Sequence, residues 1–240
     1  MDTIGSRLEL LVGDEGIKRL QSASVLILGI GGVGSWTAEA LARSCVGHLT
    51  LVDYDTIKAS NLNRQIHALH STLGRSKVDA MADRIRDINP SCRVEGVSTR
   101  LEAGSVSELL SSTGWSCVID AIDERQPKTA AIVYCLRNGI PILSSMGSAN
   151  KTRHDLVQVA DISETYSCPL AKLMRKALNK EGIQSGLTVC FSPELPAGSA
   201  SETQPEAPGE RRPLGTIAYL PAIFGLKLAA EAIDIILGRK

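Results

Sequence analysis

Short apolar runs alternate along the first part of the chain with segments whose apolar positions recur at helical spacing. The runs at residues 25–28, 48–52, 93–97, 117–122 and 140–144 predict buried strands. The segments at 35–44, 76–89 and 105–111 predict helices, and a further helix begins at Pro127 and ends at Gly139. Strands that alternate with helices predict a doubly wound, Rossmann-like α/β fold, with a mostly parallel sheet and helices on both faces.

The pattern changes after residue 147. Strands are predicted at 156–160 and 187–191, with a basic helix at 169–182 between them. Residues 193–213 are rich in Pro, Gly, Ser and Glu, which predicts a mobile loop. We therefore expect a single domain over residues 1–240, with a core at about 7–147 and a C-terminal extension at 148–240.

An apolar stretch at 214–237 is long enough to span a bilayer. It contains Lys227, Glu231 and Asp234, whose spacings of four and three residues place them on one helical face. This pattern predicts an amphipathic helix that closes one side of the domain, not an obligate membrane span. Peripheral contact with a membrane is the alternative.

Composition narrows the function classes. The chain of 240 residues is 43% hydrophobic, 22% charged and only 3% aromatic, which predicts a globular protein with an aliphatic core. A formal charge of +0 gives no overall attraction to nucleic acid, so such a partner would need a local basic patch. The six cysteines include no C-x-x-C pair, and the N-terminus lacks a signal-peptide pattern. We expect reduced thiols, no zinc site and a cytoplasmic location.

A glycine loop follows the first predicted strand. Gly29, Gly31 and Gly34 satisfy G-x-G-x-x-G, and Gly32 adds a fourth glycine. Such a loop lets a phosphate approach the backbone at a helix N-terminus, and Asp53 at the next strand end can hold ribose hydroxyls. The motif alone also fits a nicotinamide-dependent oxidoreductase, or a tight turn without a ligand.

The residues beyond Asp53 favour ATP over a nicotinamide cofactor. Breaking an α–β phosphate bond needs cations for the leaving pyrophosphate, a role that suits Arg64 and Lys77. Asp55 and Asp123 can hold Mg²⁺, and Asp123 follows a parallel strand on the edge where such sheets bind ligands. Asn61 and Gln65 supply neutral hydrogen bonds. We expect Arg64, Lys77 and Asp123 to be catalytic.

Each of these residues has a simpler interpretation. Lys77 would be a solvated residue in the first turn of a helix, and Asp55 and Asn61 would form turns. Asp120 would face solvent, and we leave it out of the predicted site. Together, at these spacings, the residues favour a site.

The motifs resemble the ubiquitin-activating-type, ThiF-like adenylating enzymes. The resemblance rests on the glycine loop, on Asp53-x-Asp55, on Ser60-Asn61-Leu62-x-Arg64-Gln65, on Lys77 and on Asp123. Within that superfamily the chain looks most similar to tRNA threonylcarbamoyladenosine dehydratases. The features shared with that branch are Gly31–Trp36, residues 63–69, 86–90 and 118–123, the later Phe191-Ser192-Pro193-Glu194 and the C-terminal helix.

The resemblance implies that residues 1–240 form a single adenylating-enzyme domain, with the nucleotide-binding core at about 7–147 and the substrate-side extension at 148–240. It also implies a function and a set of partners. It implies ATP-dependent cyclisation of threonylcarbamoyladenosine in tRNA through an acyl-adenylate of the threonyl carboxylate, with ATP and Mg²⁺ as cofactors. It implies ATP contacts at the glycines, Asp53, Asp55, Asn61, Arg64, Gln65, Lys77 and Asp123. It also implies a homodimer in which an N-terminal arginine, here Arg7, reaches the partner's ATP. Residues 195–213 look like an insertion relative to the family.

Three alternatives stay open. An activator of a ubiquitin-like sulfur-carrier protein would share the ATP site, and a sulfur-relay protein is a further partner to consider. A nucleotide-binding regulator without catalysis leaves Arg64, Lys77 and Asp123 unexplained, and an oxidoreductase leaves residues 61–65 unexplained. One feature of the sequence, independent of the resemblance, bears on tRNA. The 169–182 helix carries a basic stripe of Lys172, Arg175, Lys176 and Lys180. Such a stripe can contact phosphates, but it is also typical of a solvated helix face.

Overall fold

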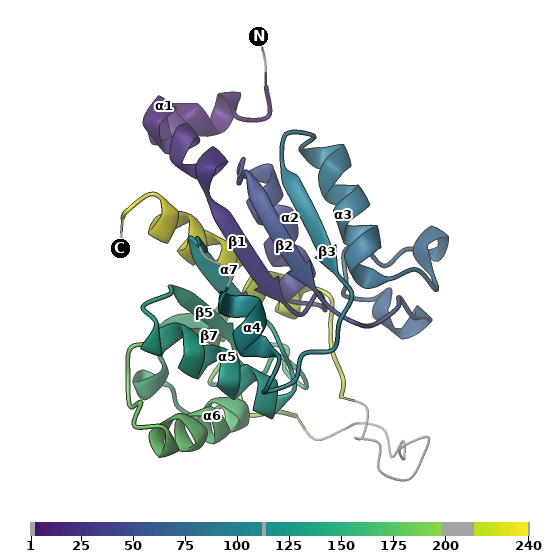
Figure 1. The fold of residues 1–240 in the computed structure, drawn as a ribbon. Helices are drawn as coiled ribbons and strands as arrows, with labels where there is room; N and C mark the ends of the chain where they lie inside the picture. Colours follow the sequence, from purple (N-terminus) through teal and green to yellow (C-terminus); the bar gives the residue numbers. More distant parts are fainter. Residues whose placement is uncertain (1–2, 112–113, 198–213, 240) are drawn as a thin grey trace.

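A single seven-stranded sheet forms the centre of the protein (Figure 1). The computed structural model describes residues 3–111, 114–197 and 214–239. The strand order is β3-β2-β1-β4-β5-β7-β6, and only β6 runs antiparallel to its neighbour. The strands are β1 (Ser24–Leu28), β2 (His48–Val52), β3 (Arg93–Val97), β4 (Cys117–Asp120), β5 (Ile142–Ser145), β6 (Gln158–Asp161) and β7 (Thr188–Phe191). The predicted doubly wound α/β fold is confirmed.

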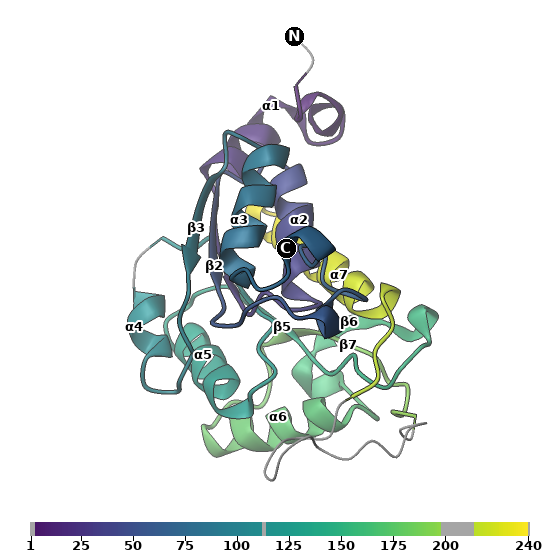
Figure 2. The same cartoon turned by 90° about the vertical axis from the view of Figure 1, so that its right-hand side faces the viewer.

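Helices cover both faces of this sheet (Figures 1 and 2). One face carries α1 (Ser6–Ser22), α2 (Gly34–Arg43), α3 (Lys77–Ile88) and α7 (Tyr219–Ile236). The other carries α4 (Val106–Ser111), α5 (Arg125–Arg137) and α6 (Pro169–Lys180). Short 3₁₀ turns lie at Ala59–Asn61, His70–Thr72, His154–Leu156 and Ile162–Glu164.

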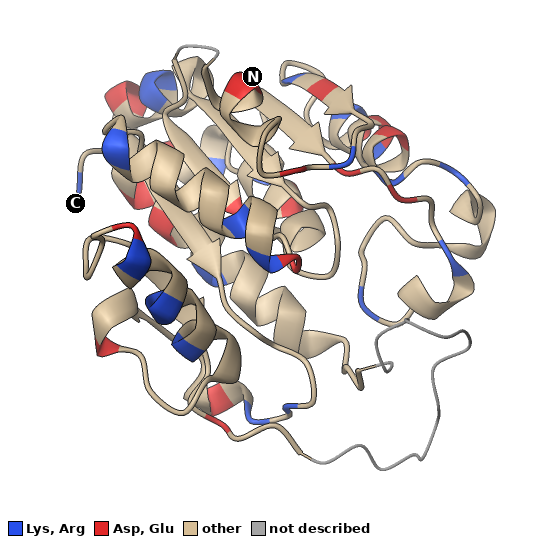
Figure 3. Ribbon diagram, turned by 60° about the horizontal axis from the view of Figure 1, so that its bottom comes forward, with Lys and Arg blue, Asp and Glu red and all other residues tan. Residues whose placement is uncertain are grey.

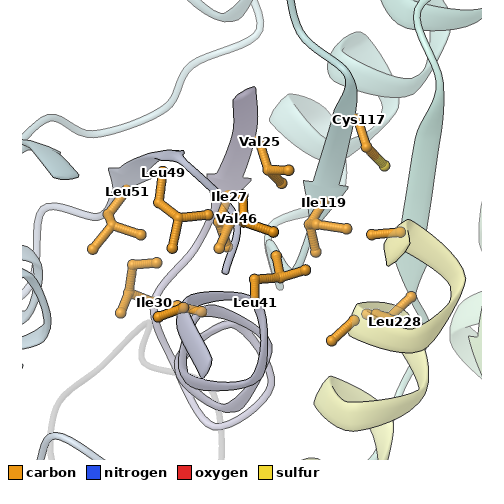
Figure 4. Close-up of a cluster of buried hydrophobic side chains, with 14 of the residues drawn as sticks. Val25, Ile27, Ile30, Leu41, Val46, Leu49, Leu51, Cys117, Ile119 and Leu228 are labelled. Atoms are coloured by element: carbon orange, nitrogen blue, oxygen red, sulfur yellow. The ribbon is translucent and has the colours of Figure 1, made fainter. Parts of the chain in front are cut away.

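The central strands are apolar throughout because each buries both faces. In β1, Val25 and Ile27 point toward α2, where they form a fully buried cluster with Leu41 (Figure 4). Leu26 and Leu28 point to the opposite cluster, under α4, α5 and α6. Alternate side chains of one strand thus supply two cores, which is why the strand reads as a continuous apolar run.

Helix boundaries differ from the sequence predictions at three places. The pattern did not predict α1, which is bent at Gly13 (φ 72°) and exposes much of its apolar surface. Helix α5 begins at Arg125, before Pro127, because first-turn N–H groups need no intrahelical partner and a proline is tolerated there. Helix α7 begins at Tyr219 and not near 214, because the backbone at Gly215 is hydrogen-bonded to Asn150.

Helix α7 packs directly beside the glycine loop and against α2. A Cβ on Gly225 would lie 2.5 Å from the carbonyl oxygen of Val33, so only glycine permits this approach. The Thr37 hydroxyl donates to the Gly225 carbonyl oxygen at 3.1 Å. The amphipathic helix predicted from residues 214–237 is therefore part of the core. No helix within the described residues has the length and apolarity to cross a membrane.

Asn150, in the loop after β5, joins two chain segments. Its carbonyl oxygen accepts from Ala197 N at 2.7 Å, its N donates to Gly215 O at 2.8 Å, and its Oδ1 accepts from Gly215 N at 2.6 Å. These bonds fix the backbone on both sides of residues 198–213. That stretch, most of the predicted loop at 193–213, lies outside the described residues. The division into core and extension stays a prediction, although β6 and β7 from the extension complete the same sheet.

Candidate active site

A cleft of about 940 Å³ opens at the carboxyl ends of the parallel strands. The strand order reverses between β1 and β4, and the chain leaves these neighbouring strands in opposite directions. Such a switch point leaves a crevice in which doubly wound sheets bind ligands. The segments after β1 and β4 meet there, because Gly29 has φ +89° and a Cβ on it would lie 2.8 Å from the Ala121 carbonyl oxygen.

Glycine is needed at different positions of the loop for different structural reasons. A Cβ on Gly34 would lie 1.8 Å from the carbonyl oxygen of Gly29, so Gly34 is required to close the loop. Gly34 does not line the cleft, whereas Gly29, Gly31 and Gly32 do. A Cβ on Gly31 would meet only the Gln65 amide, at 4.0 Å. Gly31 therefore leaves open space over the backbone, as a phosphate would require.

The Asp53 carboxylate ties the glycine loop to the end of β2. Its Oδ2 accepts from Ile30 N at 2.8 Å, and its Oδ1 accepts from Asp55 N at 2.9 Å. The side chain is 10% exposed and lines the cleft. Asp53 thus orients two parts of the site while keeping acceptor positions for a ligand.

Lys77 lies inside the site. Its ammonium is 2.7 Å from Asp55 Oδ2 and 3.8 Å from Asp53 Oδ1, and its side chain is only 7% exposed. The interpretation of Lys77 as a solvated first-turn residue is wrong, because the turn after β2 folds back so that Lys77 N donates to Asp55 O. The result is a buried cation held between two carboxylates at the cleft wall.

Arg64 and Gln65 approach the cleft from the segment after the first 3₁₀ turn. The Arg64 guanidinium donates to Ser60 O at 2.8 Å and to Asn63 Oδ1 at 3.0 Å, and burial lowers its pKa. The Trp36 indole donates to the backbone oxygen of Arg64 at 3.1 Å. Gln65 is buried, and its Oε1 has no hydrogen-bond partner among the described residues. An orphaned buried amide at a cleft wall is what a missing polar ligand would leave.

Asn61 combines the two roles proposed for it. Its Oδ1 accepts from Lys58 N at 3.0 Å, which closes the 3₁₀ turn. The residue also lines the cleft and is 8% exposed. The turn-forming interpretation therefore holds for the amide oxygen, while the amide NH₂ makes no hydrogen bond to the described residues.

Asp120 corrects the sequence analysis. It does not face solvent: its side chain is fully buried, and Oδ2 lies 2.8 Å from the equally buried Lys128 ammonium. Asp120 also accepts from Ser144 Oγ at 2.6 Å and Ile122 N at 3.1 Å, and Lys128 donates to Ile122 O at 3.0 Å. Helix α5, which carries Lys128, packs over this end of β4 and keeps Asp120 from solvent.

This buried pair holds the turn that carries Asp123. Asp123 itself is exposed and lines the cleft. Among the described residues, none forms a hydrogen bond or ion pair with its side chain. A carboxylate without such a partner, in the cleft that Asp55 also lines, suits Mg²⁺, which takes one or two protein carboxylates together with phosphate oxygens and water. Within the described residues no group of three or more His, Cys, Asp and Glu side chains gathers as a protein-only metal site.

Arg7 lies apart from these residues. It is exposed near the start of α1. Helix α1 lies at the opposite end of the sheet from the strand ends that form the cleft (Figure 1). It is not among the described residues that line the cleft. Arg7 therefore cannot serve its own chain's site in this arrangement.

Sequence reasoning missed the substrate-side wall of the cleft. Residues 145–151, Cys168–Leu170, Pro196, Leu214 and Thr216 line it. The buried Lys151 donates to Ser192 O at 2.7 Å, and burial lowers its pKa. Glu194 caps this wall by accepting from Thr152 N at 2.9 Å and Arg153 N at 2.8 Å. These residues come from loops that the fold brings together, so no local pattern announces them.

Known proteins match this chain over nearly its whole length. The model of the ThiF family matches residues 6–240. A tRNA threonylcarbamoyladenosine dehydratase of Bacillus subtilis is 42% identical over 95% of this chain and 92% of the relative. The Escherichia coli enzyme of that name, solved in complex with ATP, is similar with a TM-score of 0.86 and 36% identity, covering 96% of this chain and 92% of that one. A more distant structure, Escherichia coli MccB, shares the fold with a TM-score of 0.68 at 18% identity. The family match, the identity and the cleft at the switch point agree, and the chain belongs to the ThiF family of adenylating enzymes.

Proposed function

We propose that this chain is an ATP-dependent tRNA threonylcarbamoyladenosine dehydratase. The observation that carries the proposal is the cleft itself, in which the glycine loop faces Lys77, Arg64, Asp55 and Asp123. Its cations suit a leaving pyrophosphate, and its carboxylates suit a divalent ion. The high identity with a dehydratase over both full lengths supports the choice of substrate.

The reaction divides into two balanced steps. The threonyl carboxylate oxygen forms a bond to the α-phosphorus of ATP, the α–β bridging bond breaks, and pyrophosphate leaves. The neighbouring carbamoyl group then bonds to the activated carbonyl carbon and gives up a proton, the bond from that carbon to the AMP oxygen breaks, and AMP leaves as the ring closes. The second nucleophile belongs to the substrate, so no cysteine is needed, consistent with the burial of all six cysteines.

The residues divide the work by position. The backbone at Gly31 and Gly32 receives the phosphates, and Asp53 receives the ribose. Lys77 and Arg64 stabilise negative charge on the leaving pyrophosphate. Asp55 and Asp123 hold Mg²⁺, which supplies further charge neutralisation when bound. Asn61 and Gln65 direct neutral hydrogen bonds into the cleft.

The test is a comparison of two substrates. Purified protein with ATP and Mg²⁺ should release pyrophosphate when tRNA carrying threonylcarbamoyladenosine is added, and mass spectrometry of the digested tRNA should find the modified nucleoside lighter by one water. Pyrophosphate release driven instead by a small carrier protein that ends in Gly-Gly would replace this proposal by a sulfur-carrier activator. An Asp123→Asn variant should keep its fold and need more Mg²⁺ for half-maximal rate.

We also propose a homodimer that completes each site with Arg7 of the other protomer. The position of Arg7 outside its own cleft supports this, and so do Leu10 and Leu11 on α1, each 78% exposed, which offer apolar surface for a partner. Variants Arg7→Ala and Arg64→Ala, each inactive alone, should regain about a quarter of wild-type activity when exchanged into mixed dimers. Random mixing makes half of the dimers mixed, and each has one intact site. No recovery after verified exchange would exclude sharing of Arg7.

We further propose a cytoplasmic location, because the substrate of the proposed reaction is tRNA.

A further inference from the structure

A second hollow of about 890 Å³ lies outside the cleft, between α4, α5 and α6. Its floor is apolar, with side chains from α5 and α6. Its rim is cationic: Arg125 and Arg137 come from α5, and Lys176 and Lys180 from α6. The acid among its lining residues, Glu181, pairs with Arg137 at 3.0 Å. We call this surface the α5–α6 groove.

Helix α6 presents an unopposed row of lysines along this groove. Lys172, Lys176 and Lys180 are exposed and lie four residues apart, so they follow one side of the helix at intervals of about 6 Å. The helix has no acidic residue from Pro169 to Lys180. Figure 3 shows the basic positions, in blue, recurring along α6. Because the whole chain has a formal charge of +0, this row is a local concentration of positive charge.

Arg175 is not part of the row, although the sequence pattern included it. Its guanidinium donates to the Thr165 carbonyl oxygen at 2.8 Å and to the Thr165 hydroxyl. The residue is half-buried and holds α6 against the turn before it. The row is thus narrower than predicted, and its members share one exposed direction.

The groove begins where the cleft ends, on both of its walls. On one wall, Cys168, Pro169 and Leu170 line the cleft, and the same helix continues with Leu173 and Lys176 along the groove. On the other wall, residues 123–124 line the cleft and residues 125–126 line the groove. A polyanionic chain with one unit seated in the cleft would therefore pass directly over the lysine row.

We infer that the α5–α6 groove binds the phosphate backbone of the RNA whose modified base enters the cleft. This inference rests on the proposed function and locates its macromolecular substrate. Phosphates interact with Lys and Arg in a sequence-independent way, and the released counterions make binding steeply dependent on salt. The exposed Leu173, 44% accessible beside the row, gives an apolar contact for sugar or base faces.

The test compares two charge-matched triple variants of the full chain. One is Lys172→Ala/Lys176→Ala/Lys180→Ala. The control removes three exposed cations away from the groove, Lys18→Ala/Arg86→Ala/Arg93→Ala, which lie on α1, α3 and β3. The readouts are the KM for modified tRNA, the KM for ATP, kcat at saturating tRNA, and the salt dependence of the KM for tRNA. Thermal midpoints establish that both variants are folded.

We expect the α6 variant to raise the KM for tRNA at least about tenfold while the KM for ATP and kcat stay within about twofold. Loss of three phosphate contacts should make the logarithmic salt slope shallower by about 2 to 3, so that a fourfold rise in salt weakens wild-type binding about 16- to 64-fold more than variant binding. The control variant should match wild type in the KM for tRNA.

Each other outcome is decisive. If wild type cyclises tRNA and the α6 variant has the KM and salt slope of the control, the groove does not bind RNA while the proposed function stands. If wild type shows no pyrophosphate release with modified tRNA, the proposed function fails before the variants are compared. If the α6 variant loses binding to phosphatidylserine-containing vesicles but keeps its KM for tRNA, the row serves a membrane surface and the inference is overturned.

Discussion

The buried Asp120–Lys128 pair should be one of the most sensitive points of the fold. We consider Lys128→Met, which keeps the volume and apolar stem of the side chain but removes the ammonium. In the native protein that ammonium lies 2.8 Å from Asp120 Oδ2 and 3.0 Å from Ile122 O, and both charged side chains have no exposed surface. The variant leaves Asp120 with only two neutral donors, Ser144 Oγ and Ile122 N.

The size of the effect follows from this burial. Breaking a buried ion pair by removing one partner costs about 3–5 kcal/mol, because the remaining charge has neither water nor a counterion. A typical domain is stable by only about 5–15 kcal/mol, so a large part of the stability would be lost. Removing both charges should cost less than the sum of the single changes, since no bare charge then remains.

Urea unfolding of four proteins measures this coupling: wild type, Lys128→Met, Asp120→Asn and the double variant. We expect each single variant to lose about 3–5 kcal/mol and the double variant to regain more than about 1 kcal/mol relative to additivity. A cost below about 1 kcal/mol for Lys128→Met, or strictly additive effects, would refute the reasoning. The enzymatic activity of the folded fraction is a separate measure of the position of Asp123, because the Asp120–Lys128 pair holds the turn that carries Asp123.

Three further predictions follow from the cleft and its surroundings. Gly31→Ala should keep the thermal midpoint but weaken ATP binding, because its Cβ would occupy open cleft space. Gly34→Ala should unfold the loop, because its Cβ would lie 1.8 Å from a backbone oxygen. Calorimetry and nucleotide titration of both variants distinguish these effects. Arg64→Ala should lower the rate of pyrophosphate release by about 10²–10³. The variant should keep the fold, since the bond from Trp36 uses the backbone of Arg64 and the bonds that are lost, to Ser60 O and Asn63 Oδ1, are local. Full activity would remove Arg64 from the mechanism. Burial lowers the pKa of His67 to about 4 from 6.5, so its contribution of about 3 kcal/mol to stability is present above pH 6.5 and is lost as pH falls toward about 4. Denaturation midpoints measured against pH should flatten over this window in His67→Leu, and an unchanged pH dependence would contradict the assignment.

Much of the fold was predictable because its signals are local. The buried strands read as apolar runs, and the glycine loop follows β1 at the place where a turn must be tight. The site residues at strand ends were predictable for a topological reason. Asp53 follows β2 and Asp123 follows β4, and these two strands lie on either side of β1. The strand order alone therefore places both residues at the same edge of the sheet. Lys77 lies at the same edge because α3 begins beside the carboxyl end of β2.

The rest depended on contacts between distant residues. The sequence around Asp120 does not identify Lys128 as its partner. An aspartate at a strand end suggests solvent exposure, but α5 and Ser144 of β5 enclose this one. Helix α1 was missed because two of its leucines are exposed and Gly13 breaks its periodicity. Lys151 and Cys168 line the cleft only because β7 and α6 bring separate loops to one wall.

The shared carboxylate of Asp53 has a consequence for which sugar the cleft accepts. An ionised carboxylate offers about four acceptor positions, and two of them are occupied by Ile30 N and Asp55 N. The remaining positions match a pair of adjacent hydroxyls, so a cis-diol satisfies the group while a single hydroxyl leaves a buried acceptor unpaired at a cost of about 1–3 kcal/mol. If Asp53 receives the ribose as proposed, the same bonds that hold the loop in place should favour ribonucleotides over deoxyribonucleotides. We therefore expect competition between ATP and its 2′-deoxy analogue to show roughly a tenfold or greater preference for ATP.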